Sequence, residues 1–239
     1  MARAKREQRE SAVDVVANGI IQSIVEETLR PGDRIPTEPE LAERYHVGRN
    51  SVREAIKQLQ AFGILNIRRA DGTYVAEGSS QKMLNPLLYS LILQNRDWAD
   101  FVQLREVIEI GVLHVAMEDP GIHAIVPGLS DCVTAMQKAA ELSPPDVERI
   151  LEQDLAFHLA VTDATHNPQV TTVYEYITRI SVPSRRTSIE KWIADQNMDL
   201  FLDLHRQIVR VIEEGDTASI ERVIRAHYVY WRRTRREEV

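Results

Sequence analysis

The chain has 239 residues, 44% of them hydrophobic, and a formal net charge of −7 at pH 7, which fits two modest domains or one large one. No apolar run approaches the roughly 20 residues that cross a bilayer, and the basic N-terminus is not followed by an apolar signal region, so membrane and secreted classes are not expected. The single cysteine, Cys132, excludes an intramolecular disulfide framework and fits a reducing cytoplasm.

Residues 1–78 are predicted to contain three helices followed by a β-hairpin. The signals are apolar residues at helical spacing, a capping box formed by Thr37 and Glu40, and a glycine, Gly63, that ends the third helix. The β-prone runs ILNIRR and TYVAE are joined by ADG, which is typical of a hairpin. The predicted helices span about 12–29, 37–45 and 49–62, and the hairpin spans 64–77.

The helix over 49–62 carries a concentrated positive charge on one side. Residues 44–69 contain six Lys/Arg and one acid, although residues 1–78 have 12 of each and residues 79–239 have 17 Lys/Arg against 24 Asp/Glu. A local basic patch in an acidic protein indicates a local anionic partner. The predicted buried side consists of Val52, Ile56, Leu59 and Phe62, and the outward side of the first turn consists of Arg49, Asn50, Ser51 and Arg53.

A helix of this length fits the major groove of DNA, where an arginine can donate two hydrogen bonds to one guanine. The hairpin adds Arg68, Arg69 and a glycine, Gly72, that permits a close approach to DNA. These elements predict a winged helix–turn–helix that binds double-stranded DNA. The alternative is that the cations form only a solvated helix face; the preceding short helix, the turn and the charged hairpin favour DNA binding.

The sequence PGDRIPTEPELAERYHVGRNSVREAIKQLQAFGIL, with RRADGTYV after it, resembles the winged-helix domain of GntR-superfamily transcriptional regulators. The resemblance covers about residues 12–77. It departs from the family pattern at Pro39, where many relatives have an arginine, and at Ala70, where many have a glycine. It implies DNA contacts from the recognition helix by Arg49, Asn50, Ser51 and Arg53, and from the wing by Arg69, Gly72 and Thr73.

The strand signals stop after the hairpin, and breaks containing proline, glycine or asparagine divide the rest into six or seven helices of bundle length. We therefore predict a mainly α protein with a winged helix–turn–helix domain at 1–78, a linker at 79–85 and an all-helical domain at 86–239. The predicted breaks lie at 95–97, 119–121, 143–145, 166–168, 182–184 and 214–216.

Four polar residues occupy positions where three of these helices should bury hydrocarbon: Asp154, His158, His205 and His227. A buried carboxylate is unfavourable unless it is paired or bound to a metal. Asp154 and His158 are four residues apart, so both can reach one ion, and facing helices can bring the two later histidines to it. Such a set suits zinc, nickel, manganese or iron, and the residues alone do not choose among them; we take zinc as the first candidate. Each histidine could instead be a hydrogen-bonded core residue.

The helical half resembles the FCD effector domain of the FadR branch of the superfamily, in which an Asp-x-x-x-His pair and two later histidines bind a divalent metal. The resemblance implies that Asp154, His158, His205 and His227 are the metal ligands. It also implies that Arg105, within QLREVIE, contacts the carboxylate of an effector. We expect a small sugar acid or hydroxy acid as the effector, and a homodimeric, cytoplasmic repressor.

Two other functions are compatible with part of the sequence. The helical half could serve only to dimerise the protein, with structural histidines, or the four ligands could hold a catalytic ion. A catalytic metal needs an open coordination position and usually a separate acid or base. No His-Glu-x-x-His motif or nucleophile constellation supplies the second, and a winged helix would have no role in a metalloenzyme. We therefore expect that the protein is not an enzyme.

Overall fold

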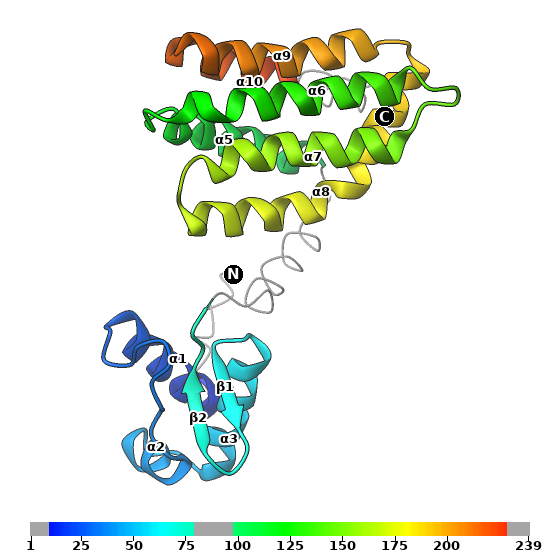
Figure 1. Ribbon diagram of the computed structural model, residues 1–239. Helices are drawn as coiled ribbons and strands as arrows, with labels where there is room; N and C mark the ends of the chain where they lie inside the picture. Colours follow the sequence, from blue (N-terminus) through cyan, green and yellow to red (C-terminus); the bar gives the residue numbers. More distant parts are fainter. Residues whose placement is uncertain (1–9, 79–97, 229–239) are drawn as a thin grey trace, which may run out of the picture. The chain divides into compact units, whose positions relative to one another are not determined.

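The computed structural model describes residues 10–78 and 98–228. The chain divides into two compact units, Met1–Ile92 and Leu93–Val239, and Figure 1 shows the described residues of each as ribbons. The predicted linker at 79–85 and the predicted break at 95–97 lie outside the described residues. Within the described ranges, no helix is long and apolar enough to cross a membrane.

The first unit combines three helices with a two-stranded antiparallel sheet, which confirms the predicted winged helix–turn–helix fold (Figure 1). One small core joins the helices to the strands, through fully buried side chains such as Ile20, Leu41, Val52 and Leu65. The elements are α1 (Ala12–Val25), α2 (Glu38–Arg44), α3 (Arg49–Ala61), β1 (Leu65–Arg68) and β2 (Gly72–Val75).

Two helices of this unit end earlier than predicted. The prediction extended α1 to residue 29, but α1 ends at Val25 because Glu27 takes a positive φ of 57° and turns the chain. α3 ends at Ala61, and Phe62 caps it as a half-buried residue rather than as part of the buried side. Gly63, with φ 78°, then directs the chain into β1.

The turn between the two strands forms the tip of the wing. Ala70 lies in this turn with φ 59°, a left-handed conformation that is unfavourable for a residue with a Cβ atom. Arg68 pairs with Gly72 at the ends of the strands. A Cβ atom on Gly72 would come within 2.6 Å of the Nε atom of Arg34. The glycine therefore lets the guanidinium of Arg34 lie against the wing.

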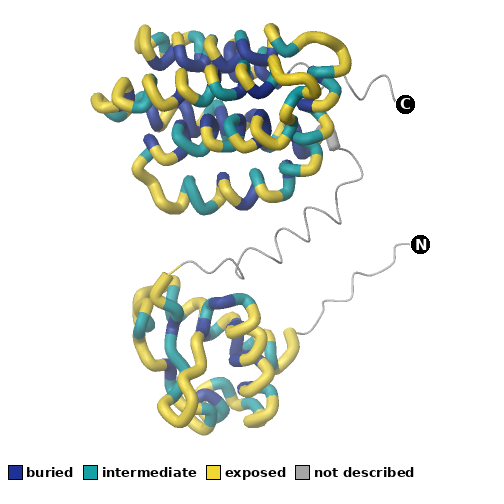
Figure 2. Tube along the Cα trace, turned by 45° about the vertical axis from the view of Figure 1, so that its right-hand side comes forward, coloured by how far each residue is buried: buried dark blue, intermediate teal, exposed yellow. Residues whose placement is uncertain are grey.

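The second unit is a bundle of six α-helices within the described residues, with buried residues on their inward sides (Figures 1 and 2). Side-chain caps begin two of them, at Asp146 before α7 and at Asn167 before α8, and the left-handed Gly215 ends α9. The helices are α5 (Trp98–Ala116), α6 (Val126–Ala140), α7 (Val147–Asp163), α8 (Pro168–Ala194), α9 (Met198–Glu214) and α10 (Ile220–His227), with short 3-10 turns at Ile122–Ile125 and Thr217–Ser219.

The predicted break at 182–184 is wrong, because α8 continues through Pro183 to Ala194. Proline lacks an N–H group and crowds the preceding turn, so it usually ends or kinks a helix. Here the side chains of Ser181 and Ser184 donate hydrogen bonds to nearby carbonyl oxygens, at 2.8 and 2.7 Å. Both halves of α8 are anchored in the core, and the helix bends rather than breaks (Figure 1).

Candidate functional site

The proposed DNA-contacting residues of α3 lie in its first turn. Arg49, Asn50 and Arg53 are exposed and Ser51 is half-buried, whereas the apolar side of the helix, including Val52, is buried against the other helices. This division leaves the first turn of α3 accessible while the core fixes its position. Such an arrangement is what a recognition helix needs in order to enter a groove.

The wing residues have different environments. Arg69 is exposed in the turn, and Gly72 and Thr73 are half-buried in β2. Arg68 lies over the ring of Tyr74, with its guanidinium carbon 4.2 Å from the ring centroid. Arg68 is therefore held on the strand by a cation–π contact, and Arg69 extends beyond it at the tip.

In the second unit, the four predicted metal ligands come together from three helices. Asp154 and His158 lie on α7, His205 on α9 and His227 on α10, and all four side chains are buried. One ligand atom from each lies within 4.8 Å of the others. Ligands of one zinc ion, bound at about 2.0–2.2 Å, must lie roughly 3–4 Å apart, so small side-chain shifts would bring all four to one ion.

The hydrogen bonding of the histidines fits a cation at their centre. His205 Nδ1 lies 2.9 Å from the backbone oxygen of Phe201, which can only accept, so Nδ1 carries the proton. In a neutral ring, Nε2 then holds a lone pair, yet it lies 3.0 Å from Asp154 Oδ1. Among the described residues, His158 Nε2 and His227 Nδ1 are buried without a hydrogen-bond partner. A metal ion would satisfy all these atoms.

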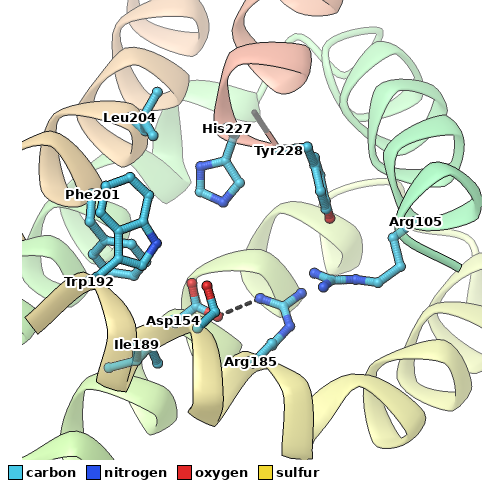
Figure 3. Close-up of a pocket in the computed structure, with 10 residues that line it drawn as sticks. Arg105, Asp154, Arg185, Ile189, Trp192, Phe201, Leu204, His227 and Tyr228 are labelled. Carbon is cyan, nitrogen blue, oxygen red and sulfur yellow. Dashed lines mark hydrogen bonds and ion pairs between the residues drawn. The ribbon is translucent and has the colours of Figure 1, made fainter. Parts of the chain in front are cut away.

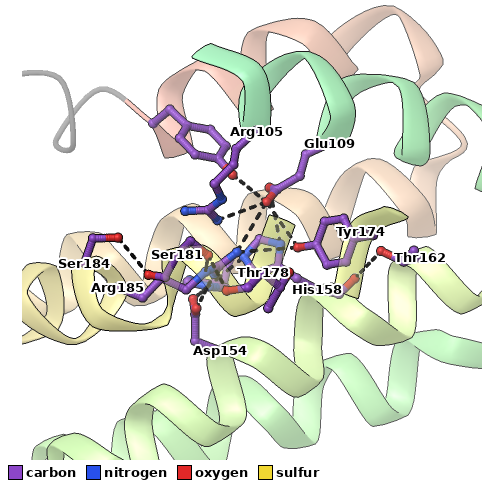
Figure 4. A network of polar contacts seen from close by, with 12 residues as sticks. Arg105, Glu109, Asp154, His158, Thr162, Tyr174, Thr178, Ser181, Ser184 and Arg185 are labelled. Atoms are coloured by element: carbon purple, nitrogen blue, oxygen red, sulfur yellow. Dashed lines mark hydrogen bonds and ion pairs between the residues drawn. The ribbon is translucent and has the colours of Figure 1, made fainter. Parts of the chain in front are cut away.

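A carboxylate that the sequence analysis did not single out lies beside this cluster (Figure 4). Glu109 Oε2 lies at an ion-pair distance of 3.4 Å from Nδ1 of His158 without forming a hydrogen bond, and the other nitrogen of that ring lies 3.7 Å from Asp154. In metal sites a carboxylate beside a histidine ring is a group that can orient this ligand. Glu109 Oε1 accepts hydrogen bonds from Arg105 (3.2 Å), Tyr174 (3.2 Å), Arg185 (3.5 Å) and Tyr228.

Arg185 is a second residue that the sequence analysis missed. It is 2% exposed, and its guanidinium contacts Asp154 through Nη1 and Glu109 through Nη2. Arg105, the predicted effector contact, is 3% exposed and lies on α5 facing the same interior. Glu109 had a sequence signal, because it follows Arg105 by one helical turn. Arg185 had none, because Pro183 suggested the end of a helix at this point.

The electrostatics of the cluster set the charge of each group. Burial raises the pKa of Asp154, but Arg185, the hydrogen bond with His205 and the charges of the nearby histidines together outweigh burial and hold this pKa well below its usual value. Burial likewise opposes ionisation of Glu109, but His158 and the two neighbouring arginines lower its pKa to about 2. Burial lowers the pKa of His158 to about 4 and that of His227 well below its usual value. At neutral pH the carboxylates are ionised and these two histidines are neutral.

A small cavity adjoins the cluster (Figure 3). Its volume is about 10 Å³, which is room for about one water molecule. Figure 3 shows Arg105 on one side of the space and the apolar wall on the other. The polar lining consists of Arg105, Asp154, Arg185, Ser188 and His227, and the apolar and aromatic lining consists of Ile189, Trp192, Phe201, Leu204 and Tyr228.

Comparisons with known proteins assign both units. Residues 12–75 match the family model described as "Bacterial regulatory proteins, gntR family", and residues 100–229 match the FCD domain. The HTH-type transcriptional regulator LutR of Bacillus subtilis is 27% identical, over 83% of this chain and 90% of its own length. The putative L-lactate dehydrogenase operon regulatory protein of Escherichia coli is 26% identical, over 90% and 82%. A solved structure, Streptococcus agalactiae GntR, aligns with TM-score 0.55 and 26% identity, over 93% and 99%.

Proposed function

The chain belongs to the GntR family of bacterial regulatory proteins and carries an FCD domain, and we propose that it is a repressor that binds its operator as a homodimer and is released by a small carboxylate. The family makes it a DNA-binding transcriptional regulator rather than an enzyme. Repression is the simpler assignment, because a protein bound at a promoter blocks the binding of other proteins to that DNA. Activation would require an additional surface that contacts one of those proteins.

The first unit of each subunit would contact one half-site. Two recognition helices related by a two-fold axis fit half-sites about 34 Å apart, one turn of DNA. The exposure of the first turn of α3 supports this assignment. The proposed contacts are Arg49, Asn50, Ser51 and Arg53 in the groove and Arg69, Gly72 and Thr73 from the wing.

In the second unit, Asp154, His158, His205 and His227 would hold a divalent metal ion, with zinc the first candidate. The buried nitrogens of His158 and His227 without hydrogen-bond partners, and the approach of His205 Nε2 to within 3.0 Å of Asp154 Oδ1, support this proposal. A bound ion would supply positive charge and an open coordination position next to the cavity. Glu109 would hold His158 in the orientation that metal binding requires.

The charge balance of the site carries the proposal of an anionic effector. The two negative charges of Asp154 and Glu109 are cancelled by the two positive charges of Arg105 and Arg185, all within one buried network. A divalent ion would therefore leave two uncompensated positive charges in a buried site, which is costly unless an anion binds. A carboxylate meets this need and can accept paired hydrogen bonds from an arginine.

The walls of the cavity favour a short hydroxy acid over a sugar acid. Ile189, Phe201 and Leu204 on this wall offer no hydrogen bonds to a chain of hydroxyl groups. A small apolar group beside the carboxylate would fit this wall. One of the relatives above is named for an L-lactate dehydrogenase operon, and a 2-hydroxy acid of that kind has the required chemistry.

Binding would also have to move part of the bundle, because a cavity of about 10 Å³ cannot hold such an acid. The part of α8 after Pro183 carries Arg185, Ser188 and Trp192, which all line the cavity. A shift of this half-helix would give the two states of the protein different affinities for the effector, which is the physical requirement for control.

The test uses metal-free protein and an operator selected from random DNA. Zinc alone should raise the melting temperature, and L-lactate should raise it further only with zinc present. Lactamide, which lacks the negative charge, is the matched control. Operator affinity, measured by fluorescence anisotropy, should fall when zinc and L-lactate are both present.

Variants distinguish a wrong assignment of the metal ligands from a helical unit that binds no metal. His205→Ala should lose the response to zinc, whereas His114→Ala, which alters an exposed histidine of α5, should keep it. Undiminished zinc binding in His205→Ala would refute the ligand assignment. A wild-type protein that binds operator but no metal would mean that the helical unit serves only to dimerise the protein.

A further inference from the structure

The recognition helix and the helix before it are joined by an ion pair between two residues of the DNA-binding unit. Arg53 Nε on α3 donates a hydrogen bond of 2.6 Å to Glu38 Oε2 on α2. From this geometry we propose that Glu38 is a specificity-determining residue that positions the guanidinium of Arg53 for contact with a guanine. The proposal rests on the proposed role of Arg53 in reading the operator.

Glu38 is held on a rigid support. It is the first residue of α2, where a negative side chain is stabilised by the helix dipole. The preceding residue, Thr37, donates its backbone N–H and its hydroxyl to the Glu40 carboxylate, both at 2.7 Å. The next residue, Pro39, has a fixed φ angle. The backbone beneath the Glu38 carboxylate is therefore fixed before DNA binds.

The contact uses one particular edge of the guanidinium. An arginine has five N–H donors in a planar fork, and the Nε donor points along one side of it. With Nε bound to Glu38, the two Nη atoms remain on the outer edge of a side chain that is 60% exposed. Two parallel donors are what the O6 and N7 atoms of guanine accept. The ion pair would thus restrict the rotamers of Arg53 in advance and present its reading edge.

The charge of Glu38 has a second effect on selectivity. A carboxylate near the DNA surface is repelled by phosphates, so it weakens binding to all sequences alike. Selectivity is a difference of affinities. A residue that strengthens the contact with one base, while weakening the electrostatic attraction to all DNA, increases the difference in affinity between the operator and other sequences. The residue next to Glu38 is Pro39, whose side chain has no hydrogen-bond donor with which to share base reading.

The experiment measures discrimination between the selected operator and copies with single guanines replaced, by anisotropy at fixed salt. Measurements on Arg53→Ala first identify the guanine whose replacement no longer changes the affinity of the protein for the operator. Glu38→Ala should reduce discrimination at that guanine about tenfold and leave binding to unrelated DNA equal or tighter. Glu38→Gln keeps an acceptor oxygen for Nε and should retain most of the discrimination. Glu54→Gln removes an exposed acid adjacent to Arg53 in α3 and should leave discrimination unchanged.

Each contrary result has a distinct meaning. If Arg53→Ala binds the operator as tightly as wild type, the assignment of Arg53 as a reader is wrong. If Arg53→Ala loses discrimination but Glu38→Ala keeps it, the positioning role of Glu38 is wrong. Equal losses at all guanines in Glu38→Ala would also overturn it, because the charge of Glu38, rather than its contact with Arg53, would then be responsible. Thermal melting of each variant shows whether the first unit is folded.

Discussion

Replacement of Arg185 by methionine is expected to make the second unit depend on a divalent ion for its stability. Methionine keeps much of the length and apolar bulk of arginine but removes the charge next to Asp154 and Glu109. Loss of one partner from a buried ion pair costs about 3–5 kcal/mol. Because Asp154 keeps its contact with His205, we expect the lower end, about 3 kcal/mol. For a unit of this size the melting temperature should fall by roughly 6–12 °C.

A bound divalent ion should replace the missing positive charge, so zinc should raise the melting temperature of Arg185→Met more than that of wild type. The assay is thermal unfolding followed by far-UV circular dichroism, with chelator or with zinc. Arg149→Met removes an arginine that is 52% exposed and should change stability by less than about 1 kcal/mol. Equal melting of metal-free Arg185→Met and wild type, or equal zinc effects on both, would refute the charge-balance argument.

Three further predictions concern stability. Below pH about 6.5, the ordinary pKa of histidine, the unfolded state binds a proton that folded His158, with its pKa lowered to about 4, does not bind. Metal-free protein should therefore lose stability as the pH falls from about 6.5 to 4, with His158 alone contributing up to ~1.4 kcal/mol per pH unit and His227, whose pKa is also lowered, adding to it. A flat urea-unfolding profile in this pH range would contradict the prediction. Ala70→Gly should stabilise the first unit by up to about 1 kcal/mol, because glycine tolerates the φ of 59°; destabilisation in urea unfolding would show that the turn is not strained. Asn167→Ala should lower the free energy of unfolding of the second unit by about 1 kcal/mol. The reason is that the side chain of Asn167 accepts hydrogen bonds from the N–H groups of Gln169 and Val170, at 3.0 and 3.4 Å. An unchanged melting temperature would mean that this cap adds no stability.

Helices and strands whose formation depends on residues close together in the sequence could be predicted from the sequence. The short helix after Thr37, the recognition helix ended by Gly63, and the hairpin all have local signals, and the structure contains each of them. The end of α1 at Val25 had a weaker signal, because no glycine or proline marks it. Pro183 gave a misleading signal, since packing on both sides of it keeps α8 continuous.

Helical spacing in the sequence was enough to predict which side of each helix is buried, and therefore that Asp154, His158, His205 and His227 point inward. It was also enough to predict the winged helix and its exposed cations, because helical spacing separates apolar from charged residues within one element. Which inward faces meet could be seen only in the folded bundle. Arg185 from α8 and Glu109 from α5 join the cluster because the bundle packs these helices around it, and Glu38 meets Arg53 because α2 packs on α3. Helical periodicity describes one helix at a time, whereas a buried charge is stabilised by partners on other helices.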